Sequence, residues 1–70
     1  MKQARIHLEI VEDLREVRRR QRLRRDVLAE IMGYHWQTVG RWERGESTPS
    51  CQALHDWCEA LGLKLRVEQR

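Results

Sequence analysis

The residues with the most obvious capacity for chemistry lie in the last third of the chain. Cys51, His55 and Cys58 are spaced so that they would share one side of a helix. Thiolates and imidazoles are usual zinc ligands. Three ligands spread along two helical turns form a poor tetrahedron, however, and the sequence offers no obvious fourth ligand. We therefore expect no metal site and interpret the cysteines as packing residues.

The sequence also lacks the residue patterns that catalysis needs. Ser47 and Ser50 stand in a loop without a glycine elbow, and the carboxylates are scattered over predicted helices. No glycine-rich loop that could hold a phosphate is present. The pattern predicts neither an enzyme nor a bound cofactor.

Arginine has the most uneven distribution of any residue type in this chain. The formal net charge is +3, and seven arginines lie between Arg15 and Arg25. Charge runs are usually solvated helix faces, but guanidinium groups also match phosphate oxygens in pairs. Two interpretations therefore stay open at this point, a solvated face and a polyanionic partner.

Length and composition limit the fold to a single small domain. The chain has 70 residues, so its core is thin. Two cysteines and no secretory leader argue against a disulfide framework, and the apolar runs are too short to span a membrane. We expect one cytoplasmic domain over residues 1–70, with a core over residues 8–62 and a tail over residues 63–70.

Two helices are predicted in the first half of the chain. Apolar residues recur at three-residue steps over residues 8–18, with carboxylates first and arginines last, as the helix dipole favours. A second helix is expected over residues 25–32 and should end at Gly33 in the left-handed conformation. Its predicted apolar side consists of Val27, Leu28, Ile31 and Met32.

Two further helices are predicted in the second half. The third covers residues 36–44, with Val39 and Trp42 directed inward. The fourth is capped either by Thr48, with Pro49 at its first position, or by Ser50 itself. It should run to about Leu61 and end at Gly62. Its predicted buried side consists of Leu54, Trp57, Cys58 and Leu61.

The tail has a different periodicity. Residues 63–68 alternate between apolar and charged side chains, which indicates a β-strand. A single strand leaves its backbone groups unpaired, and no second strand is evident in the chain. We therefore expect the tail to pair with the same strand of a second copy. The dimerisation residues would be Leu63, Leu65 and Val67.

The two middle helices and the glycine turn between them form the most informative unit. Ala29 is small enough for a close helix crossing, and Gly33 permits a sharp turn. With Val39 and Trp42 packed inward, the third helix keeps an outward face. That face comprises Trp36, Gln37, Gly40 and Arg41. An exposed helix fits the major groove of DNA, and its amino-terminal side chains reach base edges.

Several ordered motifs strengthen this interpretation. The chain contains Leu28-Ala29-x-x-x-Gly33, Thr38-Val39-x-Arg41-Trp42-Glu43-Arg44-Gly45, Pro49-Ser50 and Ala60-Leu61-Gly62. Together these motifs resemble the Cro/C1-type (XRE) helix-turn-helix family over about residues 14–63. The resemblance implies an all-α, compact four- to five-helix domain like that of lambda repressor, with a DNA-reading segment over roughly residues 33–45. We expect a short C-terminal β-strand in place of the fifth helix.

The resemblance also implies roles for individual residues. The base-reading positions are Trp36, Gln37, Thr38, Gly40 and Arg41. The candidate phosphate contacts are Arg24, Arg25, Tyr34, His35 and Arg44. Tyr34 could instead pack beside the turn, and His35 could instead cap the third helix. Arg18 and Glu43 match positions that form a buried ion pair in relatives, whose expected work is to orient the third helix.

The sequence therefore predicts a transcriptional regulator that binds double-stranded DNA as a homodimer. Its operator would be a near-palindromic site, and the protein would be nucleoid-associated when bound. An antitoxin that represses its own operon, with a toxin as partner, is an alternative. A second alternative is a protein-interaction adaptor in which the exposed Trp36 is the hot spot.

Overall fold

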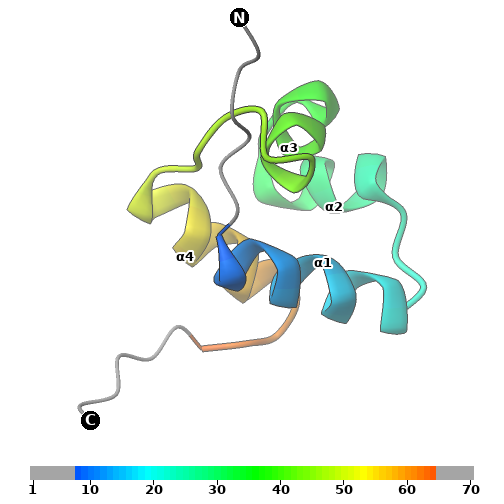
Figure 1. Cartoon of the computed structure of the whole chain (residues 1–70). Coiled ribbons are helices and arrows are strands. Elements are labelled where there is room, and N and C mark those ends of the chain that lie inside the picture. Colours follow the sequence, from blue (N-terminus) through cyan, green and yellow to red (C-terminus); the bar gives the residue numbers. More distant parts are fainter. Residues whose placement is uncertain (1–7, 65–70) are drawn as a thin grey trace, which may run out of the picture.

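The computed structural model describes residues 8–64 as four helices, without a strand in that range. Helix α1 spans Glu9–Arg20, α2 spans Arg25–Met32, α3 spans Trp36–Glu43 and α4 spans Cys51–Ala60. Helix α2 contacts both α3 and α4, and α1 contacts α3. Figure 1 shows α3 on the opposite side of the molecule from the end of the described chain. The prediction of an all-α helical domain is confirmed.

The core forms where the apolar stripes of the four helices meet. Trp57 is completely buried, and its ring centroid lies 6.1 Å from that of Trp42. The predicted burial of both tryptophans is therefore confirmed. The indole nitrogen of Trp57 has no hydrogen-bond partner among the described residues, which lowers the net gain from burying this ring. The other buried apolar residues are Val11, Leu14, Leu28, Ala29, Val39, Ala53, Cys58 and Leu61.

Helix α1 is longer than predicted. The sequence indicated an end near Arg18, whereas the helix continues to Arg20. Arg18 turns into the protein instead of ending the apolar stripe, and Arg20 pairs on the surface with Glu16 one turn earlier. The chain leaves the helix at Arg22, which has a positive φ of 55°. Paired arginines can therefore continue a helix beyond its apolar pattern.

The turn between α2 and α3 forms as the sequence predicts. Gly33 has a φ of 81°, in the left-handed region that favours glycine. The backbone N–H groups of Gly33 and Tyr34 donate to the carbonyl oxygens of Glu30 and Ala29, at 3.2 and 2.9 Å. These bonds end α2 and hold α3 at a fixed distance from it. Ala29 is buried beneath the crossing, as expected for a small residue there.

One residue of α2 differs from its predicted position. Ile31 was expected on the apolar side of this helix, but it is 59% exposed. The residues near it in α4 are Asp56, Glu59 and the small Ala60, which do not cover its side chain. The contacts of α2 with the core are concentrated at Leu28 and Ala29 instead.

The start of α4 resolves two alternatives that the sequence left open. Ser50 is the N-cap, and the backbone N–H of Ala53 donates to its hydroxyl oxygen at 3.0 Å. Pro49 is buried ahead of the helix and does not belong to its first turn. The interpretation with Ser50 as cap is therefore confirmed, and the one with Thr48 as cap is wrong.

Replacing Ser50 with alanine should lower the free energy of unfolding by about 1 kcal/mol, because one amide of the first turn loses its acceptor. Thr48→Ala is the matched control. Thr48 is exposed and lies outside the cap, so this change should have little effect. Urea unfolding of both variants measures the difference. Equal losses in the two variants would contradict the assignment of the cap.

Helix α4 ends in a tight reversal. Gly62 has a φ of 76°, and the backbone N–H of Leu63 donates to the carbonyl oxygen of Cys58 at 2.7 Å. Leu63 and Lys64 follow without regular structure. The predicted strand falls mostly on residues 65–70, so Leu65 and Val67 lie outside the described residues.

Candidate nucleic-acid interface

Helix α3 is amphipathic, and its outward face carries polar groups. Val39 and Trp42 are buried, which fixes the rotation of the helix against the core. Gln37 and Arg41 are exposed, and their side chains make no hydrogen bond or ion pair with the other described residues. The amide of Gln37 and the guanidinium of Arg41 are thus available to an external partner. This is the arrangement predicted for base-reading residues.

The amino end of α3 is ordered by an imidazole. The backbone N–H of Gln37 donates to Nδ1 of His35 at 3.2 Å, so His35 acts as the N-cap. The His35 ring stacks on Trp36 with a centroid distance of 5.7 Å. Trp36 remains 52% exposed, as the sequence predicted. The two rings form a flat surface at the end of the helix that would enter a groove.

A buried carboxylate joins α3 to α1. Glu43 has a fully buried side chain, and Arg18 donates to it from Nε at 2.7 Å and from a terminal nitrogen at 2.9 Å. Arg18 also donates to the carbonyl oxygen of Leu23 at 2.9 Å. The two-pronged geometry fixes the guanidinium plane. The contact joins the middle of α1, the α1–α2 loop and the end of α3.

Two more arginines approach the same carboxylate, and the sequence gave no sign of this. Nε of Arg25 donates to Glu43 at 3.1 Å, and Nε of Arg15 lies 3.9 Å from it. One negative charge therefore faces three positive charges. The terminal nitrogens of Arg25 do not bond to Glu43, and the side chain is about one-third exposed. The excess of positive charge favours an anion at this surface.

Gly40 makes room for these arginines. A Cβ atom at this position would lie 3.0 Å from a terminal nitrogen of Arg44 and 3.3 Å from one of Arg25. Gly40 is therefore buried under two guanidinium groups, although the sequence placed it on the outward face. Arg44 is held from the other side by Glu46. The absence of a side chain lets both cations converge on α3.

Replacing Gly40 with alanine should raise the free energy of unfolding by up to about 1 kcal/mol, because glycine is a poor helix former. The groups in the way are the ends of flexible side chains, which can move by a few tenths of an ångström. Thermal unfolding measures the change. A loss of stability would show that the two guanidinium groups are held rigidly over this glycine.

Tyr34 and Thr38 are less available than the sequence suggested. The Tyr34 ring packs edge-on against Trp42, with centroids 5.2 Å apart, and its hydroxyl donates to Asp56 at 3.1 Å. Desolvation first, and then the hydrogen bond and charge of Asp56, raise the pKa of the Tyr34 phenol. Of the two alternatives for Tyr34, packing beside the turn is the one seen here. Thr38 is half-buried.

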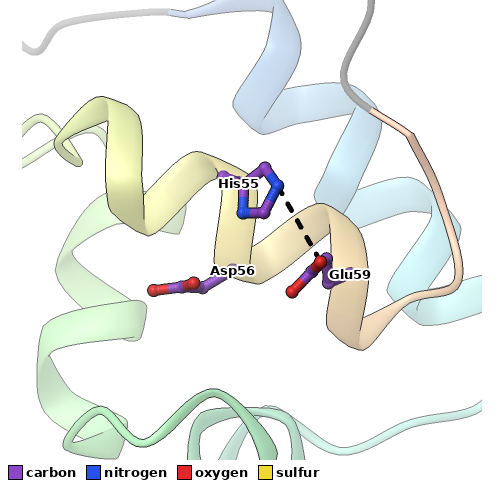
Figure 2. A group of neighbouring side chains, drawn as sticks. All are labelled: His55, Asp56 and Glu59. Carbon is purple, nitrogen blue, oxygen red and sulfur yellow. Dashed lines mark ion pairs between the residues drawn. The ribbon is translucent and has the colours of Figure 1, made fainter.

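Helix α4 carries a cluster of groups that could ligate a metal. Figure 2 shows His55, Asp56 and Glu59 with ligand atoms that all lie within 4.8 Å of one another. His55 faces Glu59 at 3.8 Å, while Asp56 accepts hydrogen bonds from Tyr34 and Gln52. These contacts account for the cluster without an ion. Cys51 and Cys58 both carry free thiols, the first exposed and the second buried.

The geometry described so far is two short helices joined by a left-handed glycine, with the second helix locked by its inner face and open on its outer face. A family model described as "Helix-turn-helix domain" matches residues 9–70. The chain belongs to this helix-turn-helix family, within its Cro/C1-type class. No curated protein matches the chain in a sequence search.

Membership of the helix-turn-helix family establishes the general class of the protein. Its domains bind DNA and serve in transcription regulation, so DNA is the partner and regulation the general role. The family is typically non-enzymatic. None of the helices in residues 8–64 combines the length and the apolar character of a membrane span.

Proposed function

We propose that this helix-turn-helix protein is a sequence-specific transcriptional regulator that binds an operator as a homodimer. Helix α3 enters the major groove, where Gln37 pairs with adenine and Arg41 with guanine. The observation that carries the proposal is the exposure of these two side chains without intramolecular partners, on a helix fixed by Val39 and Trp42. Trp36 then meets a thymine methyl group or the edge of the groove.

The phosphate contacts in this proposal come from the arginines around α3. Arg44 and Arg25 converge on Gly40 and flank the base-reading residues. Arg24 is exposed at the start of α2, where no side chain caps the helix, so it can reach a phosphate as well. His35 takes part through its stacked ring and its position at the start of α3. Contacts of this kind set the register of the protein on DNA.

The operator follows from the geometry of a dimer. Two copies of α3 would occupy successive major grooves about 34 Å apart, on a near-palindromic site. Regulation would result from occupation of a promoter and exclusion of the polymerase. The test is selection of bound duplexes from a random pool. We expect two inverted half-sites separated by one helical turn, and an unenriched pool would contradict the proposal.

The exposed Trp36 supports a second candidate function, that of a protein-interaction adaptor. Salt dependence separates the two functions. DNA binding should weaken steeply with salt, by roughly 0.9 logarithmic units per phosphate contact. An association with a protein through Trp36 would respond little to salt. We favour DNA because Arg25, Arg41 and Arg44 surround the same face.

A further inference from the structure

An apolar groove lies at the seam between α1 and the end of α4, far from the candidate nucleic-acid interface. Its volume is about 280 Å³. The apolar residues that line it are Ile10, Leu14, Val17, Cys58 and Leu63. Asp13 and Lys64 also line it and are the only charged side chains there. An apolar groove open to water in so small a protein gains free energy when it is covered.

The end of the described chain forms one wall of this groove. The hydrogen bond from Leu63 to Cys58 folds the chain back after Gly62, so that Leu63 lies against the end of α4. Leu63 remains 37% exposed. Lys64 makes no backbone hydrogen bond with the other described residues. The groove therefore has an apolar floor and an unpaired backbone edge side by side.

We propose that this groove receives residues 65–70 of a second copy of the chain, which run antiparallel to residues 63–64. The inference rests on the proposed homodimer and assigns the surface of the folded domain that the tail contacts. Leu65 and Val67 alternate with Arg66 and Glu68, so an extended tail presents its apolar residues on one face. That face covers Val17 and Cys58, while Arg66 reaches Asp13.

The length of the tail and its starting point favour a second copy over the same chain. Only six residues follow Lys64, and fully extended they span roughly 20 Å. Because Leu63 and Lys64 already line the groove, their own tail leaves over its edge and would have to reverse at once to re-enter it. The tail of a second copy enters directly and also pairs with the free backbone edge.

The position of the groove suits a DNA-binding dimer. Figure 1 shows residues 61–64, in orange, passing beneath α1 on the side away from α3. Two copies joined through this seam keep both α3 helices uncovered. The mutual exchange of tails buries the same surface on each copy, as a two-fold interface requires.

Cys58 supplies a native probe for this inference. It lines the groove and is 4% exposed, and burial raises the pKa of its thiol. Cys51 is exposed, and Cys51→Ser leaves Cys58 as the single thiol in the full chain. The measurement is the rate of reaction of Cys58 with a disulfide reagent over a range of protein concentrations, at one pH and without DNA.

We expect the rate to fall as the concentration rises, by about tenfold when nine-tenths of the copies are paired. Leu65→Ser should abolish this protection, whereas the neighbouring Arg66→Ser should preserve most of it because it changes the opposite face of the tail. Circular dichroism confirms that both variants are folded. Protection that is independent of concentration would mean that the chain covers its own groove and would overturn the proposal. A rate that stays constant in all variants would overturn it as well.

The outcome does not depend on the proposed DNA contacts. Thiol protection is measured without DNA, and the base preference of the Cys51→Ser protein is measured separately by selection. A groove that stays open while a base preference persists would remove only the tail contact. A covered groove in a protein without any base preference would remove only the regulator.

Discussion

Replacing Glu43 with leucine is expected to lower the free energy of unfolding by about 3–5 kcal/mol, because Arg18 then keeps its charge in the core without a counterion. Arg18 has a side chain that is only 10% exposed, so it cannot recover its hydration without opening the structure. A domain of this size has a total stability of about 3–10 kcal/mol. The variant should therefore be partly or wholly unfolded at room temperature, as urea titration will show.

The double variant Arg18→Met with Glu43→Leu separates burial of an unpaired charge from loss of packing. Replacement of a buried ion pair by apolar residues is often neutral or stabilising. We expect the double variant to unfold within about 1 kcal/mol of the parent protein or above it. If Glu43→Leu alone cost less than 1 kcal/mol, the ion pair would not hold α3 in place.

The double variant also tests whether the ion pair orients the recognition helix. Arg25 loses its acceptor in this variant, and α3 loses its polar connection to α1. A folded protein with weaker discrimination between operators would support an orienting role. Unchanged discrimination would reduce the role of Glu43 to folding alone.

Replacing Arg41 with alanine is expected to remove the preference at one base pair in each half-site. A two-pronged contact with guanine provides about 1–3 kcal/mol of discrimination, or about 5- to 150-fold in relative affinity. Arg41 is exposed and makes no contact with other described side chains, so its loss should leave stability nearly unchanged. Selection with the variant, compared with the parent site, measures the effect.

Arg44→Ala is the matched control for this prediction. Arg44 lies one turn further along the same side of the chain and is tethered by Glu46. As a phosphate contact, it should weaken binding to all sequences about equally and reduce the salt slope by about 1. If Arg41→Ala also weakened every site equally, Arg41 would be a phosphate contact and the assignment of the reading face would be wrong.

The positions of the helices could be predicted from the sequence because local signals determine them. Leu28 and Val39 repeat with the helical period of their neighbours, and Gly33 and Gly62 mark the ends of α2 and α4. The outward placement of Trp36 followed from the same period and is confirmed by its exposure. Signals of this kind act within a few residues, so a single sequence reveals them.

The contacts of Arg25 and Gly40 could not be predicted in the same way. Arg25 meets Glu43 across 18 positions of the chain, and nothing in the local sequence distinguishes it from Arg24. Gly40 belongs to the outward side by helical phase, but two long side chains from other places fold over it. Ile31 has an apolar residue's propensity for burial, yet its neighbours in α4 leave it exposed. Each of these outcomes depends on tertiary packing.

The most direct measurement of the central claim is an NMR titration of the protein with its selected duplex and with a scrambled duplex of equal length. The side-chain amide of Gln37 and the Nε–H of Arg41 should shift with the selected duplex and respond much less to the scrambled one. Resonances of α4 should change little with either duplex. Equal responses to both duplexes, or specific shifts confined to α4, would contradict the claim that α3 reads the bases.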